Sequence, residues 1–197
     1  MKQLRIVTIF VCSLLIASCV SNKVYEVPKY TNLQYHDIED ARKLEDKAYD
    51  GGCIETRLGD TNFDNDRILS FSNRLYDLYG SKIEGSKIRV TRFDTFIYSP
   101  TTCRNAGSAS MYTVSFAVGA LIDSTANSKL QDGVFCIIEG TVDEKEFTGS
   151  AMIQDREGVM YLHGGANSTR KLMPSMTKAI DECIERASFD IVSKIMN

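Results

Sequence analysis

Oxygen-bearing side chains at every second position form the motif in this sequence that comes nearest to a metal site. The run spans residues 60–66, and its candidate ligands are Asp60, Asn62, Asp64 and Asp66. This spacing matches calcium-binding loops, in which alternating oxygens converge on a hard cation. However, Asn65 stands where such a loop requires glycine, and Phe71 stands where it requires a bidentate glutamate. The favoured interpretation is that Asn62 or Asp64 caps the following helix, so no metal site is predicted.

Histidine chemistry is the second possibility. The only histidines are His36 and His163, and His163-Gly164-Gly165 is similar to the oxyanion loop of some esterases. The chain contains neither a G-x-S-x-G nucleophile motif nor a glycine-rich phosphate loop. A strand that ends in a Gly-Gly turn accounts for these residues without chemistry. We therefore expect no enzyme activity, no catalytic residue and no cofactor, and a hydrolase stays only as a third alternative.

The first 18 residues have the layout of a secretory signal. A basic head from Met1 to Arg5 precedes an apolar run from Ile6 to Ala17, which small residues follow. As a helix, the apolar run would reach about 18 Å, well short of a hydrocarbon core of about 30 Å. The pattern therefore predicts a cleaved signal peptide over 1–18 rather than a membrane span.

The residues around the predicted cut carry a resemblance. Ile16-Ala17-Ser18-Cys19 resembles the lipobox of bacterial lipoproteins. This resemblance implies that Cys19 begins the mature chain and carries a diacylglyceryl thioether and an N-acyl chain such as palmitate. Two or more acyl chains hold a protein stably, since each buried methylene contributes roughly 0.8 kcal/mol. No Asp directly follows Cys19, which in enterobacteria-like sorting implies a lipid-anchored outer-membrane protein facing the periplasm.

Composition and patterning divide the rest of the chain in two. Residues 19–35 are expected to be the lipidated cysteine and a flexible tether reaching up to about 50 Å. Residues 36–197 are expected to form a single α+β domain. Loss of Lys2 and Arg5 leaves 21 basic against 26 acidic side chains, a net charge of −5. An acidic chain matches nucleic acid poorly, so the expected partners are the membrane, through the anchor, and an envelope protein.

The remaining cysteines predict disulfides. Cys12 leaves with the signal and Cys19 takes the lipid, so four cysteines are left in an oxidising compartment. The expected strand order places Cys103 and Cys136 at opposite ends of a meander, beyond the Cα separation of about 7 Å that a disulfide allows. The predicted pairs are Cys53–Cys103 and Cys136–Cys183. No C-x-x-C pair occurs, so zinc is not expected.

Apolar spacing and capping signals predict three helices. Acids followed by bases predict a short helix over 36–44. A stripe at three- and four-residue intervals predicts a helix over 64–79 that Gly80 ends; its members are Ile68, Phe71, Leu75 and Leu78. Pro174 begins a final helix that ends by Met196. The inner face of this last helix is predicted to contain Met176, Ala179, Ile180, Cys183, Ala187 and Ile191.

Runs of β-branched and aromatic residues predict strands over 53–57, 87–98, 110–123 and 134–138. Phe93 marks an irregularity in the second of these. Residues Asp143 to Glu146 are predicted to form a hairpin tip before a strand over 147–153. Residues Asp155 to Gly158 are predicted to form a turn into a strand over 159–162.

The order of these elements predicts an α+β fold. It has an antiparallel or mixed sheet of about four or five strands, helices packed on one face, and a long C-terminal helix. Over residues 60–197 this order also resembles the YajG-like lipoproteins and their transport-auxiliary relatives.

The expected function is that of a non-catalytic, lipid-anchored accessory subunit. Its exposed sheet edge or groove would bind a protein of an envelope assembly, because anchoring raises its concentration near other envelope proteins. The alternative is a transport auxiliary that holds a small apolar or glycan ligand between helix and sheet.

Overall fold

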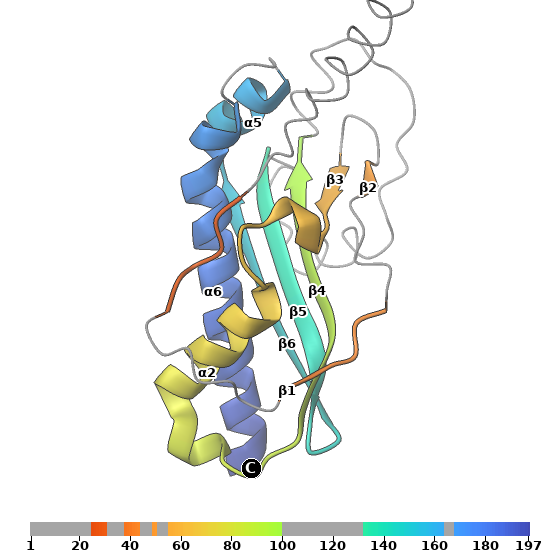
Figure 1. The fold of residues 1–197 in the computed structure, drawn as a ribbon, viewed down its shortest axis with the longest axis vertical. Coiled ribbons are helices and arrows are strands. Elements are labelled where there is room, and N and C mark those ends of the chain that lie inside the picture. Colours follow the sequence, from red (N-terminus) through yellow and green to blue (C-terminus); the bar gives the residue numbers. More distant parts are fainter. Residues whose placement is uncertain (1–24, 31–37, 44–48, 51–54, 100–131, 164–167) are drawn as a thin grey trace, which may run out of the picture.

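The chain forms an α+β structure in which one mixed sheet carries helices on one face (Figure 1). The computed structural model describes residues 25–30, 38–43, 49–50, 55–99, 132–163 and 168–197. Within these ranges no helix is long and apolar enough to cross a bilayer. The predicted fold class, including the long C-terminal helix, is confirmed.

The sheet is built around two long central strands. Its order is β2 (Tyr49–Asp50), β3 (Glu55–Leu58), β4 (Ile88–Tyr98), β5 (Gly133–Val142) and β6 (Lys145–Gln154), and neighbours are antiparallel. The β4–β5 register shifts between Val90 and Arg92, close to the irregularity predicted near Phe93. β5 is almost wholly buried because strands cover both of its edges, as its continuous apolar sequence predicts.

β1 (Ile38–Asp40) is a parallel strand beside the beginning of β4, where Ile38 pairs with Ile88. The Ala41 N–H extends this pairing with a 2.9 Å hydrogen bond to the Val90 carbonyl. The prediction of a helix over 36–44 is therefore wrong at residues 38–40. Pairing with β4 overrides the local order of acids and bases, which is a weak helix signal by itself.

The two long helices lie on the same face of the sheet. α2 (Arg67–Ile83) buries Ile68, Phe71 and Leu75 against it, as predicted. α6 (Ser168–Met196) packs its predicted inner face onto β5 and β6, and all six members of that face are fully buried. Gly149 on β6 permits this close packing, since a Cβ there would lie 2.4 Å from the Ala187 nitrogen.

Both long helices extend beyond their predicted ends. α2 continues through Gly80 to Ile83, and the left-handed residue that follows is Gly85, at φ 82°. Leu78 is 39 % exposed and so does not belong to the buried stripe. α6 begins at Ser168, and Pro174 lies inside it.

The second predicted hairpin is instead a helix, α5 (Arg156–His163). Asp155 supports its beginning, because its carboxylate accepts a 2.8 Å hydrogen bond from the Gly158 N–H. The Val159 N–H closes the first turn onto the Asp155 carbonyl. The Asp-Arg-Glu-Gly sequence is thus a helix start with a side-chain cap, a role that Asp performs as readily as a turn role.

The predicted tether is packed against the domain at residues 25–30, here called the N-terminal strap. Tyr25 and Val27 are both 1 % exposed, and Tyr25 forms a parallel bridge with Phe63. The Tyr30 hydroxyl donates a 2.6 Å hydrogen bond to Asp181 on α6. The expectation of a flexible tether is therefore wrong for this segment, because alternate apolar side chains give it a face that the helices bury.

Candidate functional site

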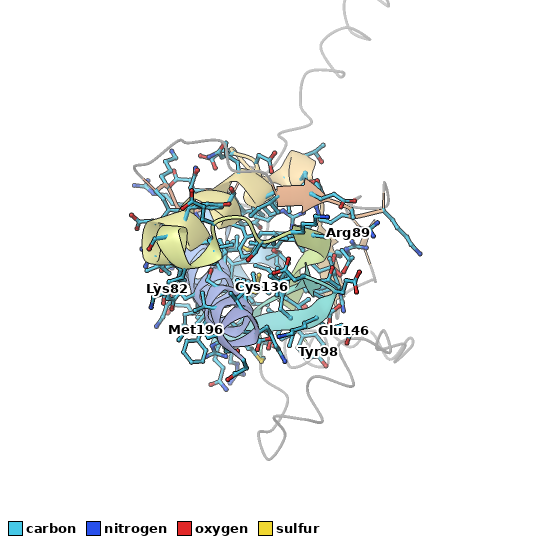
Figure 2. The ribbon with its side chains drawn as sticks, turned by 90° about the horizontal axis from the view of Figure 1, so that it is seen from below. Lys82, Arg89, Tyr98, Cys136, Glu146 and Met196 are labelled. Carbon is cyan, nitrogen blue, oxygen red and sulfur yellow. The ribbon has the colours of Figure 1, made fainter. Side chains whose placement is uncertain are left out.

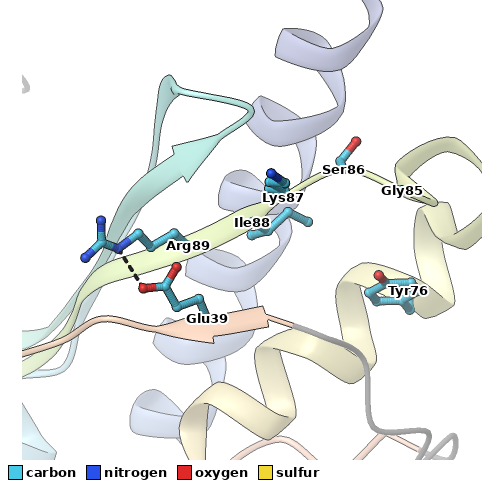
Figure 3. A pocket seen from close by; sticks show the side chains of 7 residues that line it. All are labelled: Glu39, Tyr76, Gly85, Ser86, Lys87, Ile88 and Arg89. Carbon is cyan, nitrogen blue, oxygen red and sulfur yellow. Dashed lines mark ion pairs between the residues drawn. The ribbon is translucent and has the colours of Figure 1, made fainter.

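A pocket of about 510 Å³ lies where β1, the end of α2 and the beginning of β4 meet (Figure 3). It is lined by Glu39, Tyr76, Gly85, Ser86, Lys87, Ile88 and Arg89. We call this the β1 pocket. Its position follows from the fold, since the α2–β4 connection passes beside the short strand β1.

Charged side chains surround the β1 pocket. Arg89 and Glu39 form an ion pair at 3.1 Å, and both are more than half exposed. The Lys87 side chain is exposed, whereas its backbone is fixed: its N–H donates 2.9 Å to the Asp143 carboxylate, and its carbonyl accepts 3.0 Å from the Asp143 N–H. The lining offers charged and hydroxyl groups, which can contact polar and charged groups of a ligand.

The β1 pocket also lies at an edge of the sheet. β1 pairs with β4 along one side, and no other described strand pairs with it. An exposed edge is the surface to which an extended segment of another protein can add. The pocket and the adjacent edge together form the candidate binding site.

The opposite edge of the sheet, β6, is occupied by side chains of α6. The Thr148 N–H donates 3.0 Å to Asp190, and Arg186 donates 2.7 Å to the Ser150 carbonyl. Lys145, at the beginning of β6, donates 2.7 Å to the Lys194 carbonyl. Strand addition at this edge would compete with these bonds, so β6 is a poor docking edge.

The oxygen-rich run at 60–66 serves the fold. Asp66 caps α2 and accepts from the Ile68 N–H at 2.8 Å, so the prediction that Asn62 or Asp64 is the cap is wrong, although the run does contain the cap of this helix. Asn62 instead accepts from the Gly59 N–H in a short 3₁₀ turn over Asp60–Asn62.

The other two candidate ligands, Asp60 and Asp64, contact basic side chains and a backbone N–H of this chain. Asp64 accepts from the Val27 N–H and pairs with Lys29 at 3.3 Å. Asp60 binds both Arg67 and Arg42. Within the described residues no group of three or more His, Cys, Asp or Glu could hold a metal ion.

Arg67 is a fully buried cation that sequence reasoning missed. Its guanidinium lies 4.7 Å from the Phe63 ring centre and 5.1 Å from that of Phe93. Asp60 accepts from Arg67 Nη2 at 2.7 Å, and Thr95 accepts a longer bond of 3.4 Å. The two aromatic rings and the carboxylate partner compensate the loss of hydration. Arg67 is the first residue of α2, and nothing in the neighbouring sequence indicates that its side chain is buried.

A second charged cluster lies on the sheet face away from the helices. Asp94 is 7 % exposed and contacts Arg57 at 2.5 Å and Arg92 at 2.6 Å. Glu139 lies 3.3 Å from Arg92. Burial works against the charge of Arg92, but the hydrogen bond to Asp94 and the nearby carboxylates keep its pKa above the ordinary value. This cluster joins β3, β4 and β5.

Cys136 and Cys183 lie between the sheet and α6, where Figure 2 shows Cys136 in the interior. Both are free thiols in the structure, and the Cys183 thiol donates 3.3 Å to the Gly149 carbonyl. Burial, followed by a hydrogen bond with Cys136, raises the pKa of the Cys183 thiol. The structure thus brings the predicted pair together without the disulfide, which stays a prediction.

Other predicted site residues lie outside the described residues. They include the signal peptide, Cys19, the pair Cys53 and Cys103, and the predicted strand over 110–123. His163 ends α5, so the prediction that it ends a strand is wrong. Comparisons with protein-family models, curated proteins and solved structures find no match to this chain.

Proposed function

We propose that this protein is a non-catalytic, lipid-anchored adaptor of a bacterial envelope assembly that binds a protein partner at the β1 pocket. The lipobox-like Ile16-Ala17-Ser18-Cys19 supports the anchor, at the periplasmic face of the outer membrane. The β1 pocket supports the binding role. The observation that carries the proposal is the contrast between two edge strands: α6 side chains bond the backbone of β6, whereas β1 adjoins a charged pocket.

The contacts at the β1 pocket suit an extended, charged segment of a partner. Such a segment can hydrogen-bond along β1 while its side chains meet the exposed Lys87 and the Glu39–Arg89 pair. An exposed ion pair contributes only about 0.2–1 kcal/mol to stability. Glu39 and Arg89 can therefore each pair with a charged group of another protein instead, at little cost in stability.

In-cell photocross-linking tests this assignment. A photoreactive residue replaces Lys87 in the full-length protein, and a matched control replaces Phe189, which is 68 % exposed on α6. We expect one dominant partner adduct from position 87, none from position 189, and loss of the adduct in Cys19→Ala. Membrane-located protein that gives no adduct at 87, or equal adducts at both positions, would contradict the proposal.

Reversing the charge of a residue at the β1 pocket provides a second test in the same cross-linking experiment. Arg89→Glu should abolish the adduct while lowering the free energy of unfolding by no more than about 1 kcal/mol, because its pair with Glu39 is exposed. Lys178→Glu, at a 64 % exposed position on α6, is the matched control and should leave the adduct intact. Loss of the adduct in both variants would indicate a nonspecific effect of net charge.

The alternative is a ligand-binding transport auxiliary, and the pocket volume is the observation that favours it. A volume of about 510 Å³ lies within the range of small-molecule sites, about 300–1,000 Å³. Its charged and polar lining fits a glycan better than an apolar ligand. Glycan co-purifying with the wild type, but not with a Tyr76→Ala variant, would support this function over the adaptor.

A further inference from the structure

We infer that the end of the domain formed by α5 and the beginning of α6 lies against the membrane surface, with the β1 pocket at the opposite end. The inference rests on the proposed lipid anchor at Cys19. Three observations carry it: the direction of the N-terminal strap, the short distance from Cys19 to the strap, and the exposed basic residues of α5 and the first turn of α6.

The direction of the strap is fixed by its contacts with α6. The Glu26 N–H lies 3.1 Å from the Met173 sulfur, and the Glu26 carbonyl accepts 3.2 Å from Thr177. Tyr30 reaches Asp181. The strap, red in Figure 1, therefore runs along α6 from near its beginning toward its middle, and its first residue lies nearest the α5 end.

The linker length limits how the domain can turn. Tyr25 is six residues after Cys19, and six residues span at most about 20 Å. From Met173 to Met196, a separation of 23 positions, α6 rises about 35 Å along its axis. An anchor at Cys19 therefore cannot reach the far end of α6, so the C-terminal end of the domain cannot be the end that faces the bilayer.

The β1 pocket lies at that far end. Lys87 and Ile88 begin β4, and the register pairs Ile88 with Val142, the last residue of β5. Lys145, just beyond the β5–β6 turn, contacts Lys194 near the end of α6. The pocket would thus project away from the membrane, where a periplasmic partner can reach it.

The exposed charges of α5 and of the first turn of α6 are mostly basic. They are Arg156, Arg170 and Lys171, with Glu157 as the exposed acid of these two segments. Anionic phospholipid headgroups attract such a set. The opposite end is mixed, since Lys87, Arg89 and Lys145 lie there with Asp143, Glu144 and Glu146.

The first turn of α6 places these bases where the helix dipole disfavours them. It contains no acid, and Arg170 and Lys171 lie at its positive end. Cations are unfavourable there unless anions lie nearby. Glu157 of α5 pairs with Lys171 at 3.2 Å, and a layer of lipid phosphates would add anions beside Arg170. On α5 the 53 % exposed Met160 offers an apolar contact at the same end.

Single-tryptophan fluorescence tests the orientation, because the natural chain contains no tryptophan. Full-length lipidated Met160→Trp and Met196→Trp are reconstituted in vesicles of phosphatidylethanolamine and phosphatidylglycerol containing a nitroxide-headgroup lipid. Met160 and Met196 are 53 % and 70 % exposed, so both replacements leave the core intact. The Cys19→Ala forms of both are the unanchored controls.

We expect the nitroxide lipid to quench Met160→Trp several-fold more than Met196→Trp, and to quench neither unanchored control. Equal quenching at both positions, or stronger quenching at 196, in protein that floats with the vesicles would overturn the orientation and leave the anchor standing. Wild-type protein that fails to float would overturn the anchor itself, and the orientation with it.

Discussion

The hydroxyl of Tyr30 donates a 2.6 Å hydrogen bond to the carboxylate of Asp181, a residue 151 positions later in the chain. Arg74 of α2 stacks on the same tyrosine ring at 5.1 Å and contacts Glu185 on α6. One side chain of the strap is therefore held by both long helices. Burial, and then the bond to Asp181, raises the pKa of Tyr30 above its ordinary value.

Tyr30→Phe should destabilise the protein by about 1 kcal/mol, since it removes this hydrogen bond and leaves Asp181 without that donor. Urea unfolding measures the loss, and trypsin cleavage after Lys29 should become faster as the strap detaches. Tyr79→Phe, on the partly buried side of α2, is the matched control and should stay within about 0.5 kcal/mol of the wild type. Equal effects of the two variants would contradict a specific role for Tyr30.

Tyr25→Phe should make the protein less sensitive to alkali. Burial raises the pKa of Tyr25 from 10.0 to about 12. Because the folded-state pKa is the higher one, the stabilisation is fully present below pH 10 and is lost as pH rises toward 12, by up to about 1.4 kcal/mol per pH unit. Between pH 8 and pH 11 the urea midpoint should fall less in Tyr25→Phe than in the wild type.

At pH 8 the same variant should be at least as stable as the wild type. The Tyr25 hydroxyl is buried and has no hydrogen-bond partner among the described residues, so its removal relieves a desolvation cost. An alkaline loss in Tyr25→Phe as large as that of the wild type would show that other groups cause it.

Glu144→Gly should stabilise the protein by about 1 kcal/mol. Asp143 and Glu144 form the two-residue β5–β6 turn at φ 47° and 69°, a region that costs a non-glycine residue about 1–2 kcal/mol. Glu146→Gly makes the same substitution within β6, where glycine costs about 0.5–1 kcal/mol. The midpoint of thermal unfolding should therefore rise in Glu144→Gly and fall in Glu146→Gly. Shifts of the same sign in both variants would refute the turn assignment.

Cys136 and Cys183 should form a disulfide in protein secreted to an oxidising compartment, losing two protons and two electrons to a thiol oxidant. The bond would close a loop of 47 residues and stabilise the fold by about 4 kcal/mol in the chain-entropy account. Non-reducing peptide mapping should recover the joined peptides. Reductant should lower the urea midpoint of the wild type but leave Cys136→Ala/Cys183→Ala unchanged; two free thiols in secreted protein would refute the pairing.

Strong periodicity made the central elements predictable. The inner face of α6 and the buried run of β5 each repeat one pattern long enough to exclude alternatives, and the structure places both as expected. The fold class follows from these two elements and the β5–β6 hairpin. In the oxygen-rich run at 60–66, the favoured role as a helix start was also right, although Asp66 rather than Asn62 or Asp64 provides the cap.

Short elements depend on distant partners and were not predictable. β1 is a strand because β4 lies beside it, and the strap packs because Tyr25 and Val27 bond the segment before α2, at Asn62 and Asp64. The β1 pocket combines residues from three segments, and only their packing brings Glu39 to Arg89. The buried Arg67 likewise depends on the rings of Phe63 and Phe93, and no sequence spacing predicts that both contact it.

The bonds from Asp190 and Arg186 to β6 also bear on stoichiometry. A sheet with two open edges can accept a strand at each side and so grow into a filament. Here Asp190, Arg186 and Lys194 of α6 already bond three residues of β6, so the proposed strand addition at β1 should end after a single partner. The proposal therefore predicts a one-to-one complex at β1, without polymerisation of anchored copies through their sheets.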